Sequence, residues 1–167
     1  MITASRKEMI SGERFDTVIQ NMARLNDTAS ELALAHDASA CTDITGFGLA
    51  GHTLEVARAS RVGIRLSHAA VPFYFECLDL AHKGLKTAVT ESNRELAGRE
   101  IRFEGSLTDD AKALYFDPQT SGGLLIAVAS PRAGALLSAL HARGLTDSSL
   151  VGEVISTGAP LLEVVPS

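Results

Sequence analysis

The chain has 167 residues, of which 46% are hydrophobic and 21% charged, and its formal net charge is −5. One domain with its own hydrophobic core is the simplest expectation for this length. The acidic balance, with lysines and arginines scattered along the chain, argues against a nucleic-acid or acidic-membrane surface. It does not argue against a nucleotide, which metal and backbone groups can hold.

Apolar periodicity predicts alternating helices and strands. After an entry segment at residues 1–12, a single domain is expected over residues 13–167. The predicted helices cover about residues 15–25, 28–35, 47–60, 72–84, 108–114 and 133–143. The predicted strands cover about residues 39–44, 63–66, 100–104, 124–128, 149–155 and 161–165. This order indicates a layered α/β sandwich with a mixed sheet.

Local signals set several of these boundaries. Thr28 and Glu31 have the spacing of a capping box, Pro72 is expected to open a helix, and Thr108 is expected to cap one. Residues 85–105 show weak periodicity and are expected to be mostly irregular. The apolar run 124–128 is typical of a strand buried on both faces.

The segment at residues 40–52 reads ACTDITGFGLAGH, which predicts a strand, a Gly-rich loop and then a helix. A helix N-terminus offers unpaired N–H groups and partial positive charge, so Thr45, Gly46 and Gly48 form a candidate phosphate-facing loop. Asp43 beside it is a candidate Mg²⁺ ligand, although an acid at a strand end is more often a cap or turn acceptor. A helix-end effect of about 0.3–1 kcal/mol is far below the roughly 4 kcal/mol of even millimolar binding. This loop therefore needs metal and cationic partners.

The segment at residues 116–123 reads FDPQTSGG, in which residues 117–123 form a second polar loop. Thr120, Ser121 and Gly122 are candidates for contact with a polar ligand or another domain, and a plain turn ahead of a buried strand is an equal alternative.

His52 is expected to be a partly buried helix residue, and zinc is not expected because no second ligand stands at a suitable spacing. Cys41 and Cys77 lie in segments predicted to be buried, without a visible base, so we expect structural thiols and no disulfide framework.

Together these two segments resemble selenophosphate synthetase, also called selenide, water dikinase, of the aminoimidazole ribonucleotide synthetase-like superfamily. The resemblance covers nearly the whole chain but only the C-terminal half of that family's protein, with residues 2–4 similar to the joint between its two domains. In the irregular middle, Thr90 and Asn93 match the family's Gly-Gly-Thr-x-Arg-Asn, whereas Ala88, Val89 and Ser92 replace its glycines and arginine.

The resemblance implies the fold of the C-terminal domain of aminoimidazole ribonucleotide synthetase and a reaction of ATP, selenide and water that gives selenophosphate, AMP and phosphate. It implies that Asp43 contributes to an Mg²⁺ site shared, like the ATP, with an N-terminal domain that holds the nucleophile, an essential Lys and most metal ligands. Neither cysteine matches that nucleophile, so no catalytic residue is expected in this chain. A homodimer of the full enzyme in the cytoplasm is implied. A non-catalytic phosphate-binding or scaffolding module, or a superfamily enzyme with another small substrate, is the alternative.

Overall fold

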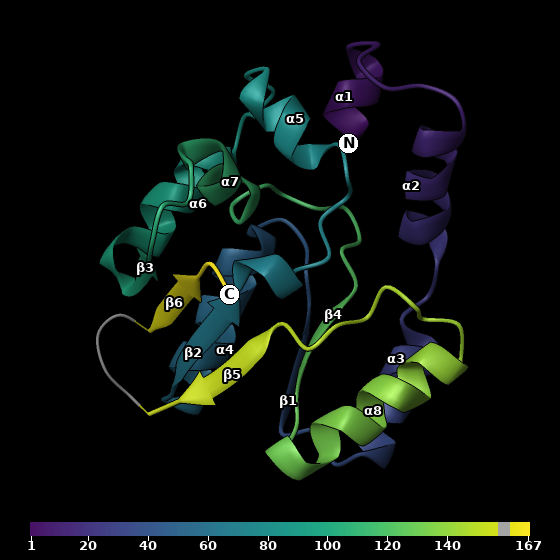
Figure 1. Cartoon of the computed structure of the whole chain (residues 1–167), viewed down its shortest axis with the longest axis vertical. Coiled ribbons are helices and arrows are strands. Elements are labelled where there is room, and N and C mark those ends of the chain that lie inside the picture. The colour runs from purple at the N-terminus through teal and green to yellow at the C-terminus, as the bar shows by residue number, and fades with distance from the viewer. Residues whose placement is uncertain (157–160) are drawn as a thin grey trace.

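A computed structural model describes residues 1–156 and 161–167, and Figure 1 shows their arrangement. Two separate β-sheets organise these residues. A four-stranded mixed sheet has the order β3 (Ile101–Phe103), β6 (Leu162–Val165), β2 (Gly63–Ser67), β5 (Gly152–Ile155). The β3–β6 and β6–β2 pairs are parallel and the β2–β5 pair is antiparallel. The predicted α/β fold with a mixed sheet is therefore confirmed.

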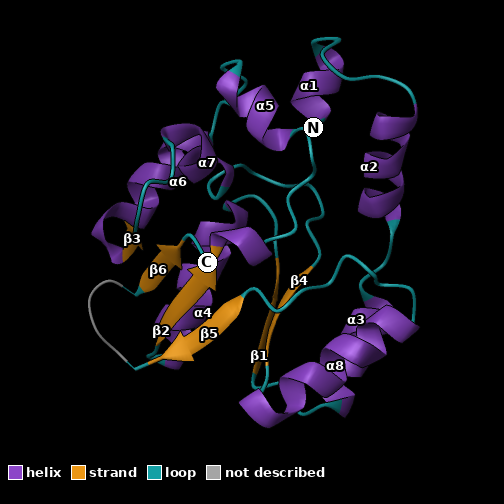
Figure 2. Ribbon diagram, in the orientation of Figure 1, coloured by secondary structure: helices purple, strands orange, loops and turns teal. Residues whose placement is uncertain are grey.

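The second sheet is a two-stranded antiparallel ribbon of β1 (Ala40–Asp43) and β4 (Leu124–Ala127). Helices α3 (Asp27–Ala35) and α8 (Ser130–Ala142) lie together at one end of the ribbon (Figure 2). Every residue of β4 is half-buried, so the prediction of a strand buried on both faces is wrong. Cys41 on β1 is exposed, which also contradicts the expected burial.

Helix α4 (Gly48–Ser60) packs against the four-stranded sheet and supplies the main core. Its Ala50, Leu54 and Ala57 are buried against Ile64 and Leu66 of β2. Neighbouring residues in a strand point to opposite faces of the sheet. Arg65 of β2 and Glu163 of β6 therefore lie on the face opposite to Ile64 and Leu66. The sheet therefore has one apolar face under α4 and one polar face.

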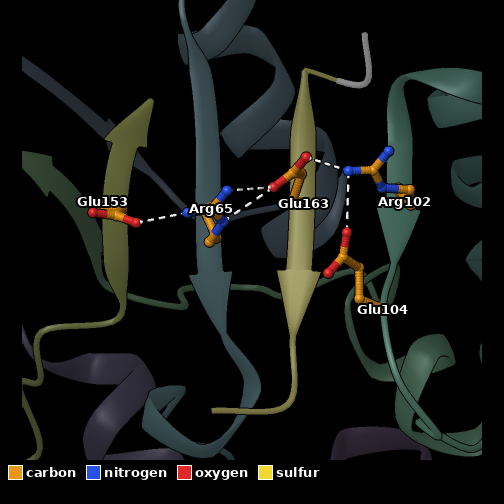
Figure 3. Close-up of polar contacts among 5 residues, drawn as sticks. All are labelled: Arg65, Arg102, Glu104, Glu153 and Glu163. Carbon is orange, nitrogen blue, oxygen red and sulfur yellow. Dashed lines mark hydrogen bonds and ion pairs between the residues drawn. The ribbon is translucent and has the colours of Figure 1, made fainter. Parts of the chain in front are cut away.

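Glu163 is the centre of the ion pairs on the polar face (Figure 3). It is only 8% exposed, it accepts a hydrogen bond of 3.0 Å from Nε of Arg65, and it also pairs with Arg102. Glu153 and Glu104 pair with the same two arginines from the outside. Glu153, Arg65, Glu163 and Arg102 occupy one register row across β5, β2, β6 and β3, so opposite charges alternate along it. Glu104 follows the end of β3 and lies outside this row.

Replacing Glu163 by Gln is expected to destabilise the fold by about 1–2 kcal/mol, because a buried acceptor of two guanidinium groups is lost. Glu153→Gln, at the exposed end of the row, is the matched control and is expected to cost at most about 0.5 kcal/mol. Urea unfolding of both variants measures the difference, and equal losses would contradict a central role for Glu163.

The remaining elements flank these sheets. They are α1 (Ile2–Arg6), α2 (Glu13–Ala23), η1 (His68–Ala70), α5 (Cys77–His82), α6 (Thr90–Ala97), η2 (Gly98–Glu100) and α7 (Asp109–Leu114). Ala4 of α1, Ile10 and Leu80 of α5 form a smaller apolar cluster beside the main core. Among the described residues, no helix combines the length and the hydropathy that crossing a bilayer requires.

Three local predictions from the sequence are wrong. Helix α3 begins at Asp27, so Thr28 lies inside the helix and forms no capping box; its N–H bonds to the Asp27 carboxylate. Helix α5 begins at Cys77, not at Pro72, because the Phe73 N–H donates to the Val71 carbonyl at 2.9 Å and so closes a γ-turn around Pro72. The segment 85–105, expected to be irregular, contains α6. In contrast, Thr108 caps α7 as predicted, accepting a hydrogen bond from the Ala111 N–H.

Candidate functional site

The β1–β4 ribbon brings the two predicted site loops together. In its register Asp43 lies opposite Leu124, so the first loop (residues 45–48) leaves the ribbon where the second loop (residues 117–123) enters it. The Ile44 N–H donates to the Gly123 carbonyl, and the Gly122 N–H donates to the Ile44 carbonyl, each at 2.9 Å. Segments more than 70 residues apart in the sequence therefore form one backbone-bonded unit.

The first loop is fastened from both sides. The Thr45 carbonyl accepts from the Gly48 N–H and from the Gln119 N–H of the second loop, both at 3.0 Å. The Thr45 hydroxyl contacts Nε2 of His52 at 3.0 Å, and Nδ1 of His52 contacts Glu55 at 3.0 Å. His52 is 6% exposed, and its ring orients the Thr45 hydroxyl. These contacts agree with the expected structural role of a partly buried helix histidine.

The N-terminus of α4 is partly occupied by the protein's own backbone. Of the first four N–H groups of a helix, which lack partners within it, that of Gly48 donates to Thr45 and that of Ala50 donates to the Tyr115 carbonyl at 2.9 Å. At most two of the four can therefore face a ligand. The adjacent Phe47 side chain is 48% exposed.

Glycines in both loops permit close contact between them. Gly48 has φ +70°, and a Cβ there would lie 2.7 Å from the Tyr115 carbonyl oxygen. A Cβ on Gly122 would lie 2.9 Å from the Ile44 carbonyl oxygen. Gly46 is exposed with open space around it, as is the Thr120 side chain, and Ser121 is half-buried. Gly48 and Gly122 are thus required by packing, whereas Gly46, Thr120 and Ser121 are accessible to a ligand.

An aromatic cluster supports the start of the second loop. Tyr115 is fully buried among Phe73, Phe103 and His68, and its hydroxyl is 3.0 Å from Nδ1 of His68. Burial raises the pKa of the Tyr115 hydroxyl and lowers the pKa of His68, because an apolar environment disfavours the charged form of each. Both groups are therefore neutral parts of a rigid support.

Helix α6 adds contacts that the sequence prediction missed. Nδ2 of Asn93 donates to the carbonyls of Gly46 at 2.9 Å and Phe116 at 3.0 Å. Thr90 contacts the Thr87 hydroxyl at 2.8 Å, and both line one pocket together with Asp117. Its buried residues Thr90, Asn93 and Ala97 have helical spacing, but only Ala97 is apolar, so apolar periodicity gives no signal for this helix.

Comparison with known proteins gives the family. Residues 3–164 match the family model described as AIR synthase related protein, C-terminal domain. The chain belongs to this family. It is also similar to three curated proteins named selenide, water dikinase: 40% identical to that of Pelobacter propionicus, 36% to that of Paraburkholderia xenovorans and 33% to that of Clostridioides difficile. These matches cover 97–98% of the chain but only 46–47% of each relative. The chain thus spans about half the length of the relatives, consistent with a C-terminal domain.

In this AIR synthase related domain, Asp43 is compatible with a partial Mg²⁺ site. Its carboxylate is exposed at the end of β1, next to the accessible part of the first loop. Among the described residues no group of three or more His, Cys, Asp and Glu side chains could hold a metal ion. Because Mg²⁺ takes one or two carboxylates and completes its shell with water and phosphate, a single carboxylate fits a contribution to a shared site. Although Cys41 is exposed, partial desolvation of its thiol and then the charge of Asp43 raise its pKa, which disfavours the nucleophilic thiolate.

Asp117 gives the AIR synthase related domain a pH-dependent stability. Burial raises the pKa of its carboxyl, against the opposing effects of the Met1 ammonium and the Thr87 hydrogen bond. The native state then holds this proton more tightly than the unfolded state, so stability falls as pH rises from about 4 through the raised pKa. Asp117→Asn is expected to remove that fall and to be more stable than the wild type above this window, but not below it. Urea unfolding between pH 3.5 and 7 tests this, with the exposed Asp147→Asn as control; parallel profiles for the two variants would contradict it.

Proposed function

We propose that this chain is the C-terminal domain of an ATP-dependent selenophosphate synthetase, in which ATP, selenide and water give selenophosphate, AMP and phosphate. The observation that carries the proposal is the joining of Asp43 and the first loop to the second loop in a chain that aligns over nearly its whole length with proteins named selenide, water dikinase. The proposed role of the domain is one wall of an Mg-ATP site.

Each part of that wall has a separate task. Asp43 would hold Mg²⁺, which supplies charge neutralisation for phosphoryl transfer when it is bound. Backbone N–H groups of the first loop would donate to phosphate oxygens, and Gly46 leaves room for a ligand to approach. Thr120 and Ser121 would contact the ligand or the domain across the cleft. The other wall would come from an N-terminal domain with the nucleophile, the essential Lys and most metal ligands, in a homodimeric cytoplasmic enzyme.

A fusion protein tests this proposal. In it, the chain replaces the matched 163 residues of the Pelobacter propionicus relative. Selenide-dependent formation of AMP by the fusion, and none by the chain alone, is the expected result. A folded fusion that binds Mg-ATP but forms no AMP would favour the alternative of a non-catalytic phosphate-binding module. AMP formation by the chain alone would contradict the assignment of catalysis to the other half.

A further inference from the structure

Asn93 is a polar residue placed inside the fold where an apolar one would be expected. It lies on α6, is 7% exposed, and both of its N–H donors are engaged, one by the Gly46 carbonyl and one by the Phe116 carbonyl. Because both partners are acceptors, only the orientation with the amide nitrogen toward them satisfies the contacts. A buried amide of this kind is costly to leave unpaired, so the geometry at this position is strongly specified.

The two carbonyls belong to different parts of the site. Gly46 is the accessible glycine of the first loop, and Phe116 immediately precedes the second loop. The loops also bond to each other through backbone groups of residues 44, 45, 119, 122 and 123. Asn93 therefore adds a side-chain connection from a third element, α6, to a unit that the ribbon already holds at its other end.

The bond to Gly46 has a directional consequence. In a trans peptide the C=O and the following N–H point in opposite directions. With the Gly46 carbonyl held toward Asn93, the N–H of Phe47 is directed away from Asn93. Gly46 and Phe47 are both exposed. That N–H lies four residues from Asp43, at the entry to α4, where the helix dipole favours an anion.

We propose that Asn93 is a positioning residue: it orients the Gly46–Phe47 peptide so that the Phe47 N–H donates to a ligand phosphate, and it couples this orientation to the second loop. The ligand class is the phosphate chain of a magnesium-bound nucleotide, so the inference rests on the proposed function for that part. The coupling between the loops is a property of this chain itself and stands separately.

The structure also explains how α6 can do this without the glycines of the resembling motif. Val89, at one of the two glycine positions, has φ −103° and ψ −1°, which any residue adopts, and its carbonyl accepts from the Asn93 N–H at 2.9 Å. Thr90, the other matching residue, bonds to the Thr87 hydroxyl, and both line one pocket with Asp117. The two matching side chains, one helical turn apart, therefore both face the region around residues 116 and 117.

The test uses Asn93→Asp, which keeps the size and shape of the side chain, and Asn93→Leu, which is larger but uncharged. Both variants remove the paired donors. In the isolated chain, the amide NMR signals of Phe47 and of Gln119 and Gly122 are expected to shift together in both variants. In the fusion, kcat/KM for Mg-ATP is expected to fall at least tenfold. Ser92→Ala is the matched control, because its exposed hydroxyl bonds only to Val89 of its own helix and should change neither readout.

A purely structural role is distinguished by Leu136→Ala, which truncates a buried residue of α8, the helix that packs with α3, and so lowers stability. It should leave the loop signals and kcat/KM unchanged. Joint movement of both loops in the Asn93 variants supports the coupling even if the wild-type fusion forms no AMP, which would refute the proposed function alone. Shifts confined to one loop would overturn the coupling, and an unchanged kcat/KM in an active fusion would overturn the positioning of the Phe47 N–H.

Discussion

Gly48→Ala is expected to lower the free energy of unfolding by about 2–4 kcal/mol, whereas Gly46→Ala should change it by less than about 1 kcal/mol. Gly48 has φ +70°, and the atoms a Cβ would meet are the Tyr115 carbonyl oxygen at 2.7 Å and the Asp117 carbonyl oxygen at 3.0 Å. Both are backbone atoms, so no side-chain rotation relieves the contact. Gly46 has nothing within 4 Å of such a Cβ.

Urea unfolding followed by circular dichroism measures this difference between two glycines of one loop. Equal losses would show that the loops are not held as closely as the structure describes. The pair also separates stability from binding, because Gly46→Ala places a methyl group on the accessible side of the first loop. We expect that variant to remain folded and, in the fusion, to bind Mg-ATP more weakly than the wild type.

Asp43→Asn is expected to reduce the AMP-forming activity of the fusion by about 100-fold or more, because even residues that only support metal ligands contribute about 10- to 100-fold. The free energy of unfolding should change by no more than about 0.5 kcal/mol, since the carboxylate is exposed at the end of β1. Steady-state AMP formation at several Mg²⁺ concentrations is the measurement.

The Mg²⁺ dependence of the rate distinguishes a lost metal ligand from other causes of reduced activity. A lost metal ligand raises the Mg²⁺ concentration needed for half-maximal rate, so excess Mg²⁺ should recover part of the activity of the Asp43→Asn fusion. Asp147→Asn, which changes an exposed acid on a turn after α8, should behave as the wild type. An Asp43→Asn fusion with unchanged turnover would remove this residue from the proposed metal site.

The sequence predicted the elements around the site better than it predicted the contacts between them. The strand before Asp43, helix 47–60 and the cap at Thr108 all follow from strong local patterns, and each is confirmed. Helix α6 was missed because its inward face carries Thr90, Asn93 and Ala97, two of which are polar. Hydrophobic periodicity cannot detect a helix whose buried side consists of small and polar groups.

The burial of the ribbon could not be predicted for a related reason. A continuous apolar run such as 124–128 is expected between two covered faces. Among the described residues, however, β4 pairs only with β1, and every one of its residues is half-buried. Exposed and half-buried residues alternate along β1, and Cys41 is one of the exposed residues. Local sequence carries no information on how many strands a sheet contains, and that number decides which faces are covered.

The aromatic cluster beside the second loop also provides an intrinsic spectroscopic probe of the site. The chain contains no tryptophan and two tyrosines, Tyr74 and Tyr115. Tyr115 is fully buried beside the site, with its carbonyl bonded to α4 and its ring among three other rings, so a rigid, chiral environment surrounds it. Its near-ultraviolet circular dichroism should therefore report the integrity of the site without an added label, and Tyr74→Phe would leave Tyr115 as the sole tyrosine.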